Sequence, residues 1–209
     1  STATSAAPTS RSTSGSTSTS MASTTAAPTT TSPPAPAYRL LSEADLRGAL
    51  VGLQDLPPGY TQDPPEADRV NKTFCDYPPP FTEQVKVSQG FTKGGGMSTE
   101  VLSLGLRQYD TPEHARAGFD AMAAALQTCT GETFEGRQVT YALMSAPKIG
   151  DASIGVKMTV DGTGVLQFFV LVGPTLINTG GGGVLDASTD EVTGVLSTQV
   201  EKYRAAAAG

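Results

Sequence analysis

One motif in this sequence could support nucleophilic catalysis. Ser145-Ala146-Pro147-Lys148 matches S-x-x-K, in which a lysine helps to activate a serine at the start of a helix. Pro147 and Gly150 disfavour a helix at this point, and neither S-D-N nor K-T-G follows in the sequence. We therefore interpret the match as chance.

The remaining reactive side chains are few. His114 falls in the first turn of an expected helix, and no serine or cysteine nucleophile is identifiable as its partner, so we interpret it as a surface residue. Two cysteines and one histidine are too few for a thiolate zinc site. The sequence therefore predicts no catalytic residue, no metal and no cofactor, which favours a protein that is not an enzyme.

Cys75 and Cys129 favour a disulfide. Cys75 lies in a long proline-rich stretch over residues 57–83, and Cys129 lies at the end of an expected helix, so one bond between them would hold the stretch against the core. In the chain-entropy model, such a bond stabilises by roughly 4 kcal/mol. Two buried free thiols in a cytosolic protein are the alternative.

The composition divides the chain into two parts. Of residues 1–37, 34 are Ser, Thr, Ala or Pro, and Arg11 is their one charged residue. Such a segment has too little apolar surface to fold, so we expect a disordered stalk, either O-glycosylated outside the cell or an unmodified linker. Residues 38–209 then form one domain. The net charge of −6 disfavours a nucleic-acid partner, and no apolar run is long enough to span a membrane.

Hydrophobic periodicity predicts six strands, over residues 84–91, 99–109, 137–143, 152–160, 165–172 and 174–178. Helices are expected after the N-caps Ser42, Thr111 and Ser188, and Gly180 to Gly183 is expected to be a turn. Tight turns between consecutive strands indicate an α+β fold, with a mostly antiparallel sheet of about five to six strands against two to three helices.

A binding site is predicted on the mixed face of strand 99–109. Arg107 and Tyr109 lie on this face, which is neither purely polar nor purely apolar, and Gly105 allows close approach to the backbone. Together with Lys157 and Thr159 on strand 152–160, they could line a shallow cleft walled by the proline-rich stretch. An ordinary exposed face, or one covered by that stretch, is the alternative.

The order of these features resembles a known family. A capped helix at Ser42 precedes Leu56-Pro57-Pro58-Gly59-Tyr60, Cys75, a strand pair, an Ala-rich helix that ends at Cys129, and a Gly150-Asp151 turn. Over about 39–205, this order is similar to that of the extracellular sensor domain of mycobacterial receptor serine/threonine kinases, the PknH type, which also occurs on actinobacterial lipoproteins. Its members typically have two disulfides, whereas this chain has cysteines for one.

The resemblance implies an exported, non-catalytic module that is anchored upstream by a lipid or a membrane helix. We therefore expect a sensor domain at the cell envelope that binds a small molecule, glycan, lipid or peptide. The first alternative is an envelope lipoprotein that docks to a membrane signalling protein and modulates its signalling or assembly. The second is an exported hydrolase.

Overall fold

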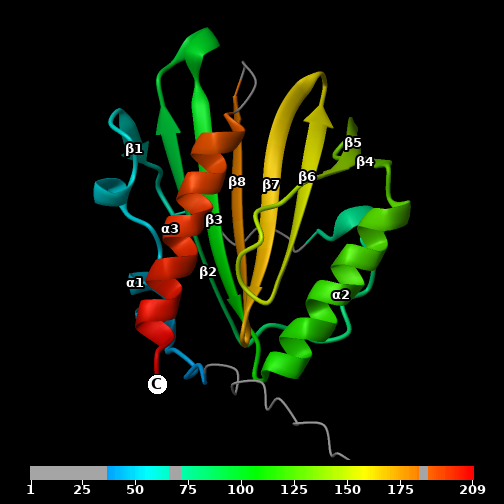
Figure 1. Ribbon diagram of the computed structural model, residues 1–209. Coiled ribbons are helices and arrows are strands. Elements are labelled where there is room, and N and C mark those ends of the chain that lie inside the picture. Colours follow the sequence, from blue (N-terminus) through cyan, green and yellow to red (C-terminus); the bar gives the residue numbers. More distant parts are fainter. Residues whose placement is uncertain (1–36, 66–71, 184–187) are drawn as a thin grey trace, which may run out of the picture. The chain divides into compact units, whose positions relative to one another are not determined.

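Eight antiparallel strands form one sheet in the computed structural model, which describes residues 37–65, 72–183 and 188–209 (Figure 1). The strands lie in the order β1-β2-β3-β8-β7-β6-β5-β4, so β3 and β8 are adjacent at the centre although they are far apart in the sequence. The strands are β1 (Tyr60–Gln62), β2 (Val85–Lys93), β3 (Glu100–Gln108), β4 (Gly131–Phe134), β5 (Arg137–Met144), β6 (Ala152–Val160), β7 (Thr163–Val172) and β8 (Thr175–Gly183).

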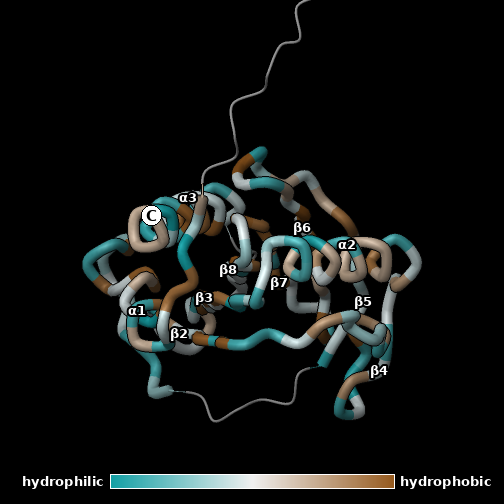
Figure 2. Tube along the Cα trace, turned by 90° about the horizontal axis from the view of Figure 1, so that it is seen from below, coloured by the Kyte–Doolittle hydropathy of each residue, from teal (hydrophilic) through white to brown (hydrophobic). Residues whose placement is uncertain are grey.

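Three α-helices cover parts of the sheet: α1 (Glu43–Gly48), α2 (Pro112–Thr128) and α3 (Thr189–Ala207). Their N-caps are the predicted Ser42, Thr111 and Ser188, whose side chains each accept a hydrogen bond from a backbone N–H in the first turn. Helix α1 lies beside β2, α3 packs on β8 and β7, and α2 contacts β8, β7 and β5. Figure 2 shows α1 and α3 at the left of the view and α2 at the right. Short 3-10 turns are formed by Leu53–Asp55, Phe74–Asp76 and Gly96–Ser98. None of the described helices is long and apolar enough to cross a membrane.

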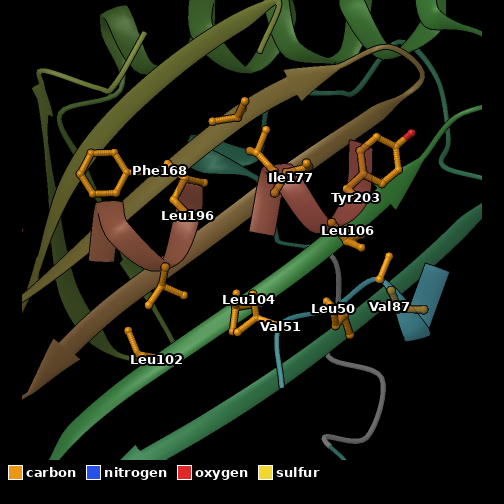
Figure 3. Packing of buried hydrophobic residues seen from close by; sticks show 14 of the residues in the cluster. Leu50, Val51, Val87, Leu102, Leu104, Leu106, Phe168, Ile177, Leu196 and Tyr203 are labelled. Atoms are coloured by element: carbon orange, nitrogen blue, oxygen red, sulfur yellow. The ribbon is translucent and has the colours of Figure 1, made fainter. Parts of the chain in front are cut away.

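One face of the sheet, which we call the α3 face, holds the larger core. Leu102, Leu104 and Leu106 point to this face from β3, as their alternation predicts, and pack with Leu196 and Tyr203 of α3 (Figure 3). The opposite α2 face holds a smaller core, in which Phe119, Met122 and Leu126 of α2 pack against residues of β6, β7 and β8. The second core is confined to part of its face, and the site described below lies on the rest.

Two buried glutamines fix the chain around α1. The carboxamide of Gln108 accepts from the N–H of Leu41 and donates to the C=O of the same residue, at 2.8 Å in each case. Gln199 of α3 accepts from the N–H of Val51 at 2.9 Å and donates to the C=O of Ala49 at 2.7 Å. These bonds satisfy backbone groups that lie outside the regular helix and would otherwise be buried without partners.

The structure confirms a mixed α+β fold with three helices, but the expected number of five to six strands is wrong. The two additional strands, β1 and β4, have three and four residues and lie at the two edges of the sheet. Segments this short have too little alternation to reveal a strand. The predicted stalk over residues 1–37 lies, apart from Ala37, outside the described residues, and the division of the chain at residue 38 stays a prediction.

The expected turn at Gly180 to Gly183 is also wrong, because these glycines form the last part of β8. Gly181 lies on the α3 face, where a Cβ would collide with Cγ2 of Val192 in α3. Gly180 lies on the other face, where a Cβ would collide with the side chain of Gln167. The glycines therefore allow a helix and a neighbouring side chain to lie directly on the strand backbone, rather than turning the chain.

Candidate functional site

The predicted site residues lie on two opposite faces of the sheet. Arg107 is in register with Leu176, Leu171 and Ala152 across β3, β8, β7 and β6, so these four side chains share the α2 face. Lys157 is five residues beyond Ala152 on β6, and the two-residue period of a strand turns it to the α3 face together with Thr159. The prediction that the four residues line one cleft is therefore wrong. Two strands, β8 and β7, lie between β3 and β6. The alternation within each segment shows which residues share a face of that strand, but it does not show which faces of the two strands lie on the same side of the sheet.

Arg107 and Tyr109 hold a neighbouring chain segment in place. A guanidinium nitrogen of Arg107 is 3.3 Å from a carboxylate oxygen of Glu83, which itself is largely buried. Tyr109 is only 3% exposed, and burial raises the pKa of its hydroxyl to about 12. These two residues therefore fix the segment that leads into β2, rather than presenting free polar groups to a ligand.

Beside them, a line of polar groups crosses the part of the α2 face that residues 37–65, 72–183 and 188–209 leave uncovered. Gly90, Ser103, Gly180 and Gln167 are in register on β2, β3, β8 and β7. Asp63, which follows β1, places a carboxylate oxygen 2.9 Å from the position of a Cβ on Gly90. We call Asp63, Ser103 and Gln167, together with Asn178 in the adjacent register position, the polar row.

The carboxamides of the polar row lie flat on glycine backbone. The carboxamide of Gln167 lies over Gly180, where the hydroxyl oxygen of Ser103 also approaches to 2.8 Å of the Cβ position. Asn178 lies in the same way over Gly105. Across the described part of the chain, the side chains of Ser103, Gln167 and Asn178 have no hydrogen-bond partner, and all three are at least partly exposed. Their donors and acceptors are thus available to an external molecule.

The position of Asp63 is fixed by the edge of the sheet. Its N–H donates to the C=O of Gly90 at 2.9 Å, and one carboxylate oxygen accepts from the hydroxyl of Thr92 at 2.9 Å. The other oxygen lies over Gly90, toward Ser103. The carboxylate of Asp63 is thus a hydrogen-bond acceptor in a fixed position at the β2 end of the polar row.

An apolar line runs parallel to the polar row, one register step toward the β2–β3 hairpin. Val101, Gly182, Val165 and Met158 are in register on β3, β8, β7 and β6. Val101 is 41% exposed, and Val165 and Met158 are partly exposed. We call Val101, Val165 and Met158 the apolar row. The solvated face of an antiparallel sheet is ordinarily polar, so exposed apolar side chains in register beside unpaired polar ones mark this surface as a binding candidate.

A second candidate is a shallow pocket at the start of α3, which also includes Val101 and Gly182. Its polar groups already bind one another: the hydroxyl of Tyr60 donates to Glu191 at 2.6 Å, and Lys93 lies 2.7 Å from Glu100 and over the ring of Tyr60. Burial, followed by the bond to Glu191, raises the pKa of the Tyr60 hydroxyl. This network ties β1, β2 and β3 to α3, and we interpret it as structural.

The disulfide between Cys75 and Cys129 is present, with the Cα atoms 5.9 Å apart, as the sequence favoured. The turn that contains Cys75 is also held by Glu132, which accepts from the N–H of Cys75 at 3.2 Å, from Lys72 at 2.5 Å and from the Tyr141 hydroxyl at 2.5 Å. Burial alone would raise the pKa of Glu132, but these bonds lower it overall. Phe74 of the same turn packs edge-on against Tyr141 and Phe169 of the second core.

The reactive residues of the sequence are not assembled into a catalytic group. Ser145 and Lys148 lie in the coil between β5 and β6. The ring of His114 stacks on Phe81 and has Nδ1 2.6 Å from a carboxylate oxygen of Asp110. Within the described ranges, no group of three or more His, Cys, Asp or Glu side chains is placed to hold a metal ion.

Comparisons with known proteins bear on the fold. No family model matches the sequence, and no curated protein matches it. Among solved structures, the chain is similar to the extracellular domain of PknH from Mycobacterium tuberculosis, with a TM-score of 0.58 and 13% sequence identity. The chain therefore shares the fold of the PknH extracellular domain. The match covers 80% of this chain and 99% of the PknH domain, so it includes the sheet and its helices rather than one motif.

Sequence reasoning pointed to the strand face that carries the candidate site but missed most of the residues on it. Gly105 lies on the same face as Arg107, as the alternation along 99–109 predicts, and Val101 and Ser103 lie there too. Gln167 and Asn178 were missed, because β7 is apolar on both sides apart from Gln167, and β8 was expected to end before the glycines. One signal was available: Gln167 is the one polar side chain between Val165 and Val172.

Proposed function

We propose that this protein is an extracytoplasmic sensor domain without catalytic activity, which binds its ligand on the polar and apolar rows of the α2 face. The observation that supports the site is the set of half-exposed Gln167 and Asn178 carboxamides, which lie on a glycine surface without partners in the described structure. The fold similarity to the PknH extracellular domain and the disulfide support the extracytoplasmic setting. The upstream membrane anchor belongs to the same proposal.

The alternative role is docking to a membrane signalling protein. Val101, Leu143 and Phe134 are large apolar side chains on this side of the sheet that are each about 40% exposed, and such side chains favour protein contacts when they are contiguous. They belong to β3, β5 and β4, and the polar row lies beside Val101, so the surface is mixed rather than apolar. This composition favours a ligand with both polar and apolar groups over a flat protein interface.

A thermal-shift screen with envelope lipids, glycans and peptides tests the proposal, followed by amide NMR mapping of each hit. We expect a hit to move the resonances of Ser103, Gln167 and Asn178 first. Replacing both Gln167 and Asn178 with alanine should abolish the shift in melting temperature, whereas Gln127→Ala, on the exposed side of α2, should leave it unchanged. Resonance changes confined to the α3 face would contradict the proposed site.

A further inference from the structure

We infer that the ligand of the α2 face is an uncharged polysaccharide chain that lies across the strands, an inference that rests on the proposed function. The polar row and the apolar row run in parallel across at least three of the strands β2, β3, β8, β7 and β6. Their chemistry, spacing and charge each restrict the class of molecule that fits.

The polar row matches hydroxyl groups. A carboxamide has two donors and an acceptor, and a serine hydroxyl can donate or accept, so these groups can bind a sugar hydroxyl in either role. Ser103 and Gln167 converge over Gly180, and a molecule resting there would be within reach of both side chains. A ligand that has only donors or only acceptors would leave half of these groups unpaired, at a cost in binding.

The apolar row matches the other surface of a sugar. A pyranose ring has hydroxyl groups at its edge and C–H groups on its faces. Val101, Val165 and Met158 are partly exposed and lie in register beside the polar row, and a methyl group of Val165 lies over Gly182 between them. Contact with C–H groups would remove this apolar surface from water while the edge hydroxyls reach the polar row.

The spacing indicates a chain rather than a single small molecule. The polar groups lie over three neighbouring strands: Asp63 over β2, Asn178 over β3, and Ser103 with Gln167 over β8. Because neighbouring strands lie about 4.8 Å apart, these groups extend across the sheet rather than meeting at one point. The groups of the polar row lie on a surface: the shallow pocket at the start of α3 includes Val101 and Gly182 of the apolar line but no member of the polar row. An extended molecule that makes repeated weak contacts suits such a surface.

Charge excludes the acidic polysaccharides. The two rows contain the carboxylate of Asp63 and no lysine or arginine, and the nearest cation on β3, Arg107, is paired with Glu83. An anionic sugar or a polyphosphate would meet the Asp63 carboxylate, and the described members of the two rows supply no cation to neutralise it. A peptide backbone would be matched better by an open strand edge than by the face of a sheet.

The test is an NMR titration of the whole protein with defined oligosaccharides. The probes are the neutral hexasaccharides xylohexaose, mannohexaose and maltohexaose, the anionic hexamer of galacturonic acid, and a Ser-Ala hexapeptide. We expect at least one neutral hexasaccharide to shift the side-chain amide signals of Gln167 and Asn178, with a dissociation constant that rises at least tenfold in the Gln167→Ala and Asn178→Ala variants and stays unchanged in Gln127→Ala. Well-dispersed spectra of the variants would show that they are folded.

The titration distinguishes a failure of the polysaccharide inference from a failure of the proposed function. If only the anionic hexamer or the peptide shifts these amide signals, the neutral polysaccharide is wrong and the α2 face remains the binding surface. If a neutral hexasaccharide binds but shifts signals elsewhere, both the polysaccharide site and the proposed function on this face are wrong. If no neutral hexasaccharide binds at millimolar concentration, the inference is overturned.

Discussion

Gln167 on β7 lies across Gly180 on β8, and its carboxamide occupies the space that a Cβ on Gly180 would need. One residue further along, Gly181 faces the other way and receives Val192 of α3 in the same manner. Two consecutive glycines of β8 thus allow close approach on both faces of the sheet. Gly180 lets the side chain of Gln167 lie against the strand backbone, and Gly181 lets helix α3 lie against it on the other face. The stability and the binding surface of the domain both depend on this strand.

A methyl group at Gly181 should destabilise the fold. The Cβ of Gly181→Ala would collide with Cγ2 of Val192, which belongs to a packed helix and cannot rotate away without moving other core residues. We expect a loss of about 1–3 kcal/mol in the free energy of unfolding, measured by urea denaturation. Gly95→Ala is the matched control, because a Cβ there has open space, and it should leave stability unchanged or raise it by up to about 1 kcal/mol. Equal stabilities of the two variants would show that α3 does not approach β8 as described.

Removing the disulfide should destabilise the domain strongly. The bond closes a sequence separation of 54 residues, for which the chain-entropy model gives about 4 kcal/mol. The Cys75→Ala/Cys129→Ala double variant should therefore have a lower urea midpoint than the oxidised protein, and reduction of the parent protein should lower its midpoint by a similar amount. A midpoint that reductant does not change would contradict the bond.

Gln199 should be one of the least replaceable polar residues. Its carboxamide satisfies the N–H of Val51 and the C=O of Ala49, and it is fully buried. In Gln199→Ala, both backbone groups would be left unpaired, with a cost of roughly 2 kcal/mol or more. The exposed Gln127→Ala on α2 should change the free energy of unfolding by less than about 0.5 kcal/mol. Because alanine is a better helix former than glutamine, helix propensity cannot cause a loss in either variant. Equally small changes in both variants would contradict the buried hydrogen bonds of Gln199.

Stability should fall at acid pH through Glu132. Its bonds from Lys72, Tyr141 and Cys75 lower its pKa in the folded protein, so its contribution is complete above the unfolded pKa of about 4.3 and is lost as pH falls through the lower folded pKa. Glu132→Gln should be less stable at pH 7 and should lose less stability than the parent protein between about pH 5 and pH 3. The exposed Glu113→Gln is the control. An unchanged acid dependence in Glu132→Gln would assign the acid sensitivity to other carboxylates.

The sequence allowed the long elements to be predicted because each has a strong local pattern. Leu102, Leu104 and Leu106 alternate on β3, and Thr111 with Pro112 begins α2, so the elements followed from nearest neighbours in the chain. The site did not follow in the same way. Its residues come from β3, β7 and β8 and the segment after β1, and only the register of these strands shows that Gln167 shares a face with Ser103 while Lys157 does not. Register is a long-range property that local periodicity leaves undetermined.

The most direct test of the binding surface blocks it without removing any buried group. Ser103 is exposed in the middle of the polar row, so a long side chain in Ser103→Arg would cover Gly180 and Gly90 whatever the ligand is. Thr140→Arg places the same side chain at an exposed position of β5 on the opposite face. We predict that the ligand-induced rise in melting temperature is lost in Ser103→Arg and kept in Thr140→Arg. A rise that persists in Ser103→Arg, with the fold intact by NMR, would contradict the α2 face as the binding surface.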